Sequence, residues 1–293
     1  MVYCGGLKNF MRGVVVNSSR GIDMLVRKLF YVVLLSLLSV NIHAAPKPEA
    51  ISFWTTSNES SEQVVSHDAW QSLLDRYLSV KEGGVNLFNY KGVSDEDRKV
   101  LQDYLAALQA IDPRQLTKDE QFAYWVNMYN ALTVEVVLDE YPVSSIKKIR
   151  FLSSPFGPWD KNFMTIQGEK LSLNDIEHGI LRPIWQDPRI HFAVNCASIG
   201  CPNLMPTAFT AANADALMEQ AAFDYIGHSR AFGLDGNTLK LSSIFEWYGD
   251  DFGSDQAEIN EYLSDYTADD VDFDPSVSYK VKFDYDWSLN EVK

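Results

Sequence analysis

Residues 117–141, which read TKDEQFAYWVNMYNALTVEVVLDEY, predict a long helix that is apolar on nearly every side. A helix of that kind must be surrounded by other elements, so we expect it at the centre of the fold. Thr117 followed by Glu120 has the spacing of a capping box at its start. Asn127 and Asn130 interrupt the apolar surface, and buried amides need hydrogen-bond partners. They either tie the helix to neighbouring loops or line a site.

The N-terminal region predicts a secretory signal peptide. Arg27 and Lys28 precede an apolar run over residues 29–40, which is shorter than the roughly twenty residues that span a membrane. Ala44 offers a small residue for cleavage, so we expect residues 1–44 to be removed. The mature protein is then periplasmic or secreted, without a stable membrane anchor, and an uncleaved anchor is the alternative.

Domain boundaries follow from this leader. Met24 directly precedes the basic residues and is a candidate start, which would leave residues 1–23 outside the protein. Residues 45–66 are polar and rich in Ser, Glu and Pro, and predict a linker. The remaining residues, 67–293, have the length of a single globular domain.

The charge of the chain limits its partners. The net charge is −15, and removal of the leader makes it more negative because the leader carries five basic residues and one acidic residue. The excess is concentrated in residues 246–293, which hold 14 Asp and Glu but 3 Lys and Arg. Such a field repels nucleic acid and anionic lipid, so neither is an expected partner.

The order of predicted elements favours an α+β domain in which several long helices pack on a small mixed or antiparallel sheet. The expected helices cover residues 68–80, 94–111, 173–181, 211–227, 242–252 and 255–266. The expected strands are two hairpins at 162–173 and 234–241, a strand at 190–196 and a last strand at 278–285.

The segment IHFAVNCASIGCP, residues 190–202, holds the two cysteines that remain without the leader, Cys196 and Cys201. In a regular strand Cys196 would end an apolar row, with His191 on the opposite face. His178, from the preceding short helix, is then the better candidate for a base. A disulfide, a catalytic or redox thiol, and a metal site that includes His178 and His191 all remain open.

Several stretches together resemble the domain of unknown function 547 family: AYWVNMYNALT, NDIEHGILRP, RIHFAVNCASIGCP, LSSIFEWYGDDF and YDWSLN. The similarity spans about residues 85–290. It implies that the family signature falls on Trp125, Asn127, Tyr129, Asn130, Glu177, His178, Arg182, His191, Cys196, Pro202 and Trp247. It also implies that serine can stand in place of Cys201, which favours Cys196 as the functional thiol.

The leading hypothesis is a cysteine-dependent hydrolase or acyl transferase, by analogy of residue types with papain and transglutaminase. Cys196 would be the nucleophile and His178 its base, with Glu177 orienting the imidazole and His191 a further candidate. The amides of Asn127 and Asn130 would donate to a developing oxyanion. Tyr129, Arg182 and Trp247 are the candidates for substrate contacts.

Two alternatives come from the same residues. The first is a non-catalytic envelope binding or accessory domain with a Cys196–Cys201 disulfide. The second is a divalent-metal site on His178, His191 and Cys196. No cofactor is expected, and the partner is a small molecule, a peptide or an envelope component. The oligomeric state is not encoded in any pattern that we recognise.

Overall fold

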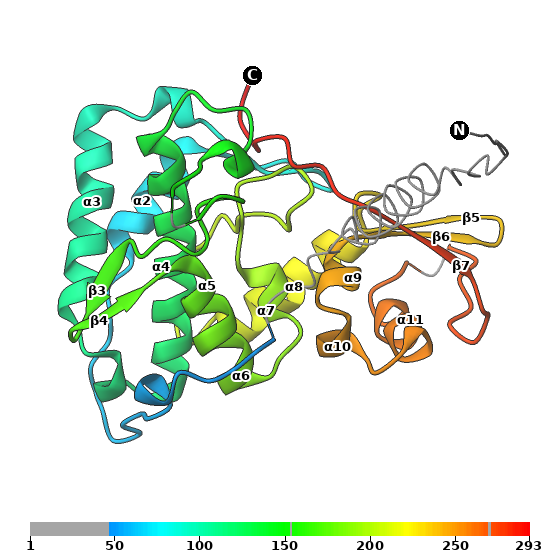
Figure 1. Cartoon of the computed structure of the whole chain (residues 1–293), viewed down its shortest axis with the longest axis horizontal. Helices are drawn as coiled ribbons and strands as arrows, with labels where there is room; N and C mark the ends of the chain where they lie inside the picture. Colours follow the sequence, from blue (N-terminus) through cyan, green and yellow to red (C-terminus); the bar gives the residue numbers. More distant parts are fainter. Residues whose placement is uncertain (1–46, 153, 269–270) are drawn as a thin grey trace, which may run out of the picture. The chain divides into compact units, whose positions relative to one another are not determined.

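The long helix predicted from residues 117–141 is α4, Lys118–Asp139, and every residue from Glu120 to Val137 is buried. Figure 1 shows the computed structural model, which describes residues 47–152, 154–268 and 271–293; α4 lies among the other helices. The predicted signal peptide and Met24 lie outside the described residues. The expectation of a central, fully buried helix is confirmed.

The start of α4 differs in part from the predicted capping box. Thr117 Oγ1 accepts the N–H of Glu120 at 3.3 Å, as expected. The Glu120 carboxylate does not return to the cap, because it accepts the backbone N–H of Val65 at 2.7 Å instead. One half of the capping box is therefore replaced by a contact to a preceding segment.

That segment, residues 47–66, was expected to be a linker, but it packs on the domain. Trp54, in the short helix η1 (Ser52–Trp54), is 1% exposed and its ring meets Trp125 of α4 edge to face at 5.3 Å. Ile51 N–H donates to the carbonyl of Gly179 at 2.9 Å. The expectation was wrong because a few apolar residues within a polar stretch bury enough surface to hold it in place.

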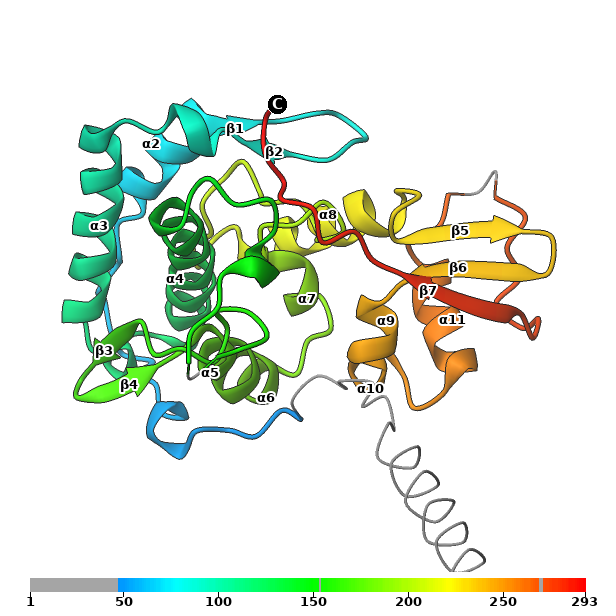
Figure 2. The ribbon, with the colours of Figure 1, turned by 45° about the horizontal axis from the view of Figure 1, so that its top comes forward.

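Other helices pack around α4, and one of them, α3, begins at its predicted cap. Ser94 Oγ accepts the N–H of Asp97 at the start of α3 (Asp95–Ala110). In Figures 1 and 2, α2 (Asp68–Tyr77), α3 and α4 lie side by side. Arg98 of α3 forms a 3.0 Å ion pair with Glu135 of α4. The next long helix, α8 (Ala214–Ile226), packs on both α4 and α7.

The strands form three small sheets in the described residues. β1 (Leu78–Ser79) pairs antiparallel with β2 (Leu87–Phe88), and β3 (Met164–Ile166) with β4 (Glu169–Leu171). In the third sheet β5 (Phe232–Asp235) pairs antiparallel with β6 (Thr238–Ser242), and β6 pairs parallel with β7 (Lys280–Asp284). The predicted hairpins and last strand are confirmed, and the α+β class with them.

Short helices connect these parts. They are α5 (Leu173–Ile176), η5 (Glu177–Leu181), α6 (Arg182–Trp185), α7 (Ile190–Ala193), α9 (Ile244–Trp247), α10 (Gly249–Phe252) and α11 (Gln256–Ser264). Single turns also occur at η2 (Tyr90–Gly92), η3 (Pro113–Gln115) and η4 (Ile146–Lys148). None of the helices in the described part of the chain has the length and apolarity of a membrane span.

The predicted strand at 190–196 is wrong. Residues Ile190–Ala193 form the helix α7, and the chain becomes extended at Val194. Asp187 and Pro188 cause this, since the Asp187 carboxylate accepts the N–H of Arg189 and its carbonyl accepts that of Ile190. Pro188, which precedes the N-cap residue Arg189, accepts the N–H of His191 with its carbonyl. The alternation of side chains between two faces therefore does not hold here.

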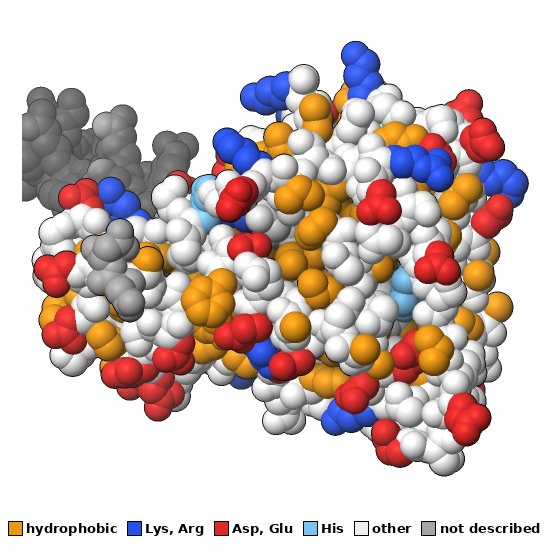
Figure 3. All heavy atoms as spheres, turned by 180° about the vertical axis from the view of Figure 1, so that it is seen from behind, with side chains coloured by type: hydrophobic (Ala, Val, Ile, Leu, Met, Phe, Trp, Pro, Cys, Tyr) orange, Lys and Arg blue, Asp and Glu red, His pale blue; other side chains and the backbone are white. Residues whose placement is uncertain are grey.

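Acidic side chains gather over the part of the chain that carries β5–β7 and α9–α11, as Figure 3 shows on one face. This agrees with the excess of Asp and Glu in residues 246–293. The segment after β7 runs back toward the helical part in Figures 1 and 2. It pairs Leu289 with Ser198 and Glu291 with Phe88, which brings it to the cysteine segment.

Candidate functional site

Cys196 and Cys201 are both free and lie together in the loop that follows α7. Their sulfurs are 3.1 Å apart and hydrogen-bonded. The backbone N–H of Cys196 also donates to Cys201 Sγ at 3.0 Å. Cys196 is partly exposed, whereas Cys201 is 4% exposed. The sequence predicts Cys196 in a buried row, whereas the residue is partly exposed in a loop.

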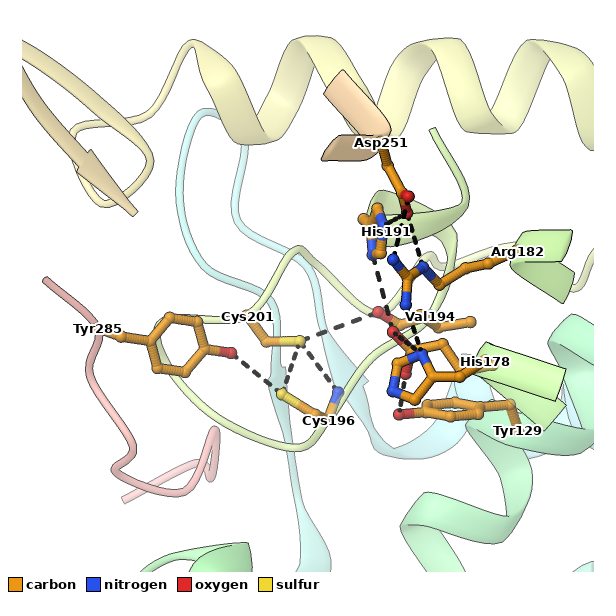
Figure 4. A network of polar contacts seen from close by, with 10 residues as sticks. Tyr129, His178, Arg182, His191, Val194, Cys196, Cys201, Asp251 and Tyr285 are labelled. Carbon is orange, nitrogen blue, oxygen red and sulfur yellow. Dashed lines mark hydrogen bonds and ion pairs between the residues drawn. The ribbon is translucent and has the colours of Figure 1, made fainter. Parts of the chain in front are cut away.

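Two hydroxyl groups complete the surroundings of the Cys196 sulfur. Tyr285 Oη lies 3.1 Å and Ser198 Oγ 3.3 Å from Cys196 Sγ, and the two hydroxyls are 2.9 Å from each other. We call Cys196, Ser198, Cys201 and Tyr285 the thiol cluster. Figure 4 shows Cys196, Cys201 and Tyr285 of this cluster on its left, with the Tyr285 hydroxyl pointing at the Cys196 sulfur.

These contacts separate the acidities of the two thiols. The pKa of Cys196 is lowered, chiefly by the hydrogen bond with Cys201 and also by those with Ser198 and Tyr285, against the opposing effect of burial. The pKa of Cys201 is raised well above its usual value, first by burial and then by its hydrogen bond with Cys196. Of the two thiols, Cys196 therefore ionises more readily, and thiolates are the reactive form of cysteine.

The loop between the cysteines is held from the C-terminal side. Ile199 N–H donates to the Ser288 carbonyl and Gly200 N–H to the Asp286 carbonyl, both at 2.8 Å. A Cβ at Gly200 would lie 2.8 Å from the Asp286 backbone nitrogen, so this close approach requires glycine. The same C-terminal segment carries Tyr285, and we call residues 285–290 the strap.

The backbone on the other side of Cys196 is held by α4. Asn130 donates to the Ala193 carbonyl at 2.9 Å and accepts the N–H of Asn195 at 2.8 Å. Asn195 Oδ1 in turn accepts the N–H of Ala197 at 2.9 Å. Ala197 has a φ of 56°, a left-handed conformation that costs an L-residue about 1–2 kcal/mol. The loop geometry that presents Cys196 is thus imposed by its neighbours.

Asn127 acts in the same way on a different loop. Its amide donates to the Phe209 carbonyl at 2.7 Å and accepts the Phe209 N–H at 3.0 Å. In both asparagines of α4, Asn127 and Asn130, the side-chain nitrogen donates to a backbone carbonyl and the side-chain oxygen accepts a backbone N–H. This supports the interpretation that they tie the helix to loops, and it places neither amide toward the Cys196 sulfur as an oxyanion donor.

A second group of polar side chains lies deeper in the domain. Its core members are Tyr129, Glu177, His178, Arg182, His191 and Asp251, which we call the imidazole–carboxylate cluster. Tyr129 Oη donates to Glu177 Oε2 at 3.0 Å. Arg182 holds Asp251 through Nε to Oδ2 at 2.6 Å and Nη2 to Oδ1 at 3.0 Å. The cluster joins α4, η5, α6 and α7 to α10.

The two histidines of this cluster have different roles. His191 Nε2 lies 2.6 Å from Asp251 Oδ2, so this nitrogen carries the proton, and the ring stacks on Tyr248 at 4.1 Å. His178 Nδ1 lies 3.1 Å from Arg182 Nη1. Because arginine only donates, the lone pair of His178 Nδ1 is already occupied.

Charge compensation explains the acidities in the imidazole–carboxylate cluster. Burial alone would raise the pKa of Glu177, but His178, His191 and Arg182 lower it to about 2. Burial also opposes ionisation of Asp251, yet the hydrogen bonds from His191 and Arg182 depress its pKa strongly. The pKa of His178 is lowered, mainly by burial. The carboxylates are therefore ionised and internally paired.

The structure keeps His178 apart from the predicted nucleophile. Among the described residues, Cys196 Sγ hydrogen-bonds only with Cys201, Ser198 and Tyr285. In Figure 4 the main chain of Val194 lies between the two groups, and its carbonyl accepts the Cys201 thiol at 3.9 Å. The predicted Cys196–His178 pair is thus not formed, because the helix α7 and the loop after it turn the sulfur toward the strap.

The remaining predicted residues do not gather at one site. Tyr129 and Arg182 were candidates for substrate contacts, but both are buried and bonded to carboxylates. Trp247 is partly exposed, and its ring lies 4.9 Å from that of Tyr285. Trp125 is buried in the core, and the Pro202 carbonyl accepts the amide of Asn195 at 2.7 Å.

Sequence reasoning missed Ser198, Tyr285 and Asp251. Tyr285 and Asp251 stand in the motifs YDWSLN and LSSIFEWYGDDF, which carry the family resemblance. Their position as polar residues in these motifs was the signal that could have identified Tyr285 and Asp251 as site residues. In the described part of the chain no group of three or more His, Cys, Asp or Glu side chains is arranged to hold a metal ion.

The comparisons with known proteins bear on the helical part and the cysteine loop. Residues 113–226 match the family model described as "Protein of unknown function, DUF547". This range contains α4, α8 and both cysteines. The searches of curated proteins and of solved structures each found no significant match.

Proposed function

The chain belongs to the DUF547 family through residues 113–226, and on this premise we propose that it is a cysteine-dependent enzyme that catalyses thiol–disulfide exchange. Cys196 is the attacking thiol and Cys201 the resolving thiol. The observation that carries the proposal is the pairing of a partly exposed cysteine with a buried one, their sulfurs 3.1 Å apart, with two hydroxyls on the sulfur of Cys196.

One round of exchange uses the two cysteines and a disulfide substrate, and an external dithiol is the reductant for the next round. The Cys196 thiolate attacks one substrate sulfur, the substrate S–S bond breaks, and the departing thiolate takes up a proton. Cys201 then loses its proton and attacks Cys196 Sγ, which forms the Cys196–Cys201 disulfide and releases the second substrate thiol. Two electrons pass from the cysteine pair to the substrate, and an external dithiol returns the pair to its reduced form.

The difference between the two cysteines suits these two steps. An attacking thiol works best as an accessible thiolate, and the contacts of Cys196 favour that form. A buried Cys201 with a raised pKa does not compete for the substrate. Once the mixed disulfide has formed, Cys201 lies beside the sulfur that it must attack.

The hydrolase or acyl-transferase hypothesis uses the same nucleophile and therefore stays close to this proposal. It requires a base at the sulfur, and the nearest polar partners there are hydroxyls and a thiol rather than His178. The two chemistries are distinguished with a nitrophenyl ester and a disulfide substrate. Release of nitrophenol that continues beyond one equivalent per Cys196 would favour acyl transfer. If the ester acylates Cys196 only once, or not at all, exchange is favoured.

The decisive experiment combines two substitutions with insulin reduction by dithiothreitol. The intact protein is expected to accelerate insulin reduction, and Cys196→Ser to abolish this activity. Cys201→Ser should trap a mixed disulfide that gel electrophoresis without reductant detects, because its resolving step is missing. Insulin reduction at the rate of dithiothreitol alone would contradict the proposal.

Redox titration separates exchange from a structural disulfide. The pair is equilibrated with glutathione buffers, and the free thiols are counted by mass after alkylation. Exchange enzymes have potentials of about −120 to −270 mV, whereas structural disulfides lie below about −300 mV. A reduction potential below about −300 mV would instead support the alternative of a non-catalytic binding domain with a structural Cys196–Cys201 disulfide.

A further inference from the structure

Aromatic side chains form a continuous surface that begins at the thiol cluster. After β7 the side chains still alternate, and Tyr285 and Trp287 share the less exposed face. The Tyr285 and Trp287 rings are 4.6 Å apart. Trp247 lies 4.9 Å from Tyr285 and 5.6 Å from Trp287, and Trp159 lies 5.6 Å from Trp287. We call these four residues the aromatic surface.

The aromatic surface is accessible and has unused hydrogen-bond donors. All four rings are partly exposed rather than buried. None of the indole N–H groups of Trp159, Trp247 and Trp287 has a hydrogen-bond partner in the described part of the chain, and none is among its buried unpaired atoms. Tyr285 is the link to the chemistry, because its ring belongs to this surface and its hydroxyl contacts Cys196 Sγ.

A positive charge lies at the far side of the same surface. Lys147 Nζ sits over the Trp287 ring, 4.6 Å from its centroid, and forms no ion pair with any carboxylate in the described residues. Lys148 and Arg150 follow directly in the sequence, and both are exposed. These three cations are unusual in a chain with a net charge of −15. The order of features is therefore the Cys196 sulfur, the aromatic rings and then a cation.

We propose that the aromatic surface binds a peptide whose disulfide-bonded cysteine is followed by an aromatic side chain and then by an acidic one. This inference rests on the proposed exchange chemistry at Cys196 and names its substrate class. The substrate cysteine lies at Cys196, the aromatic side chain packs on Tyr285 and Trp287, and the carboxylate faces Lys147. The indole N–H groups donate to peptide carbonyls.

Short peptides that carry a thionitrobenzoate mixed disulfide test this directly. Attack by Cys196 on the peptide sulfur breaks the S–S bond and releases coloured thionitrobenzoate, so each second-order rate constant is read from absorbance. Four peptides vary the two following residues: Cys-Phe-Glu, Cys-Ala-Glu, Cys-Phe-Lys and Cys-Ala-Lys. Free glutathione reacting with the same four peptides provides the intrinsic reactivity of each, by which the protein's rates are divided.

The expected preferences follow from the contacts. Phe over Ala should raise the corrected rate roughly tenfold, as for one aromatic packing interaction. Glu over Lys should raise it by about two- to fivefold, less at high salt, as for an exposed charge pair. Trp287→Ala should remove the Phe preference, Trp287→Phe should retain part of it, and Lys147→Gln should remove the Glu preference.

Matched controls come from a similar pair elsewhere in the fold. Lys118 Nζ lies 5.8 Å from the centroid of the Trp185 ring, which is also partly exposed. Trp185→Ala and Lys118→Gln should leave both preferences intact. Equal corrected rates for all four peptides, each above the glutathione rate, would overturn the peptide site and leave the Cys196 chemistry standing.

A binding readout without chemistry completes the test. The Ser-Phe-Glu peptide cannot exchange, and it should protect Cys196 from iodoacetamide more than Ser-Ala-Lys does. Protection by an oligosaccharide but not by this peptide would overturn the inference in favour of a sugar ligand. Corrected rates no higher than those of glutathione for every peptide would overturn the proposed function itself.

Discussion

Asp251→Asn is expected to destabilise the protein substantially, because Asp251 neutralises two buried groups at once. It accepts hydrogen bonds from Arg182 and His191, whose side chains are only 5% and 2% exposed. Removing one partner of a buried ion pair costs about 3–5 kcal/mol. Asn keeps the volume and one acceptor, and Asp251 itself is 19% exposed, so a smaller cost, about 2–3 kcal/mol, is expected here.

Thermal unfolding measures this cost. For a chain of this size each kcal/mol moves the midpoint by about 2–4 °C, so the midpoint should fall by roughly 5–10 °C at neutral pH. Asp250→Asn is the matched control, because Asp250 is exposed and forms no hydrogen bond or ion pair in the described part of the chain. Its midpoint should equal that of the unchanged protein.

The pH dependence of the loss supplies a second, independent check. The pKa of Asp251 is depressed in the fold, so its stabilisation is present above the ordinary carboxyl pKa of about 4 and is lost as the pH falls toward the folded value. The gap between the unchanged protein and Asp251→Asn should therefore narrow in acid. If Asp251→Asn unfolds at the same midpoint as the control at neutral pH, the reasoning is refuted.

Three further predictions concern the thiol, its loop and the leader. Tyr285→Phe removes a hydrogen bond from the Cys196 thiolate, so iodoacetamide should alkylate Cys196 more slowly at neutral pH and the alkylation profile should move to higher pH. Asn130→Ala leaves two buried backbone groups unpaired and should cost about 2–4 kcal/mol in urea unfolding, whereas the exposed Asn237→Ala should cost almost nothing. If the predicted signal peptide is cleaved, the N-terminus of protein purified from cells should be Ala45 by mass spectrometry, and a mass that includes residues 24–44 would contradict cleavage.

The helices and hairpins were predictable because their signals are local. The apolar pattern of α4, the Ser94 cap of α3 and the Gln167–Gly168 turn each lie within a few neighbouring residues. Where an apolar pattern covers only a few residues, neighbouring residues can decide the structure instead. In residues 190–196 the apolar alternation predicts a strand, but Asp187 and Pro188 start a helix immediately before it.

The partners of the functional groups were not predictable in the same way, because they are distant in the sequence. Tyr285 lies 89 positions from Cys196, and Asp251 lies 60 positions from His191. Residue types alone indicated that a thiol, imidazoles and carboxylates belong together. They could not indicate that the chain sorts them into two clusters, since that depends on how the strap and α10 return to the helical part.

The strap also has a consequence for how the protein is made. Synthesis proceeds from the N-terminus, so both cysteines emerge well before Tyr285, which is translated 89 residues after Cys196. Until then the loop from Ala197 to Cys201 has none of the backbone pairing that Asp286 and Ser288 later supply. A nascent chain therefore carries an uncovered pair of sulfurs, and a premature stop codon before residue 285 would leave them so permanently.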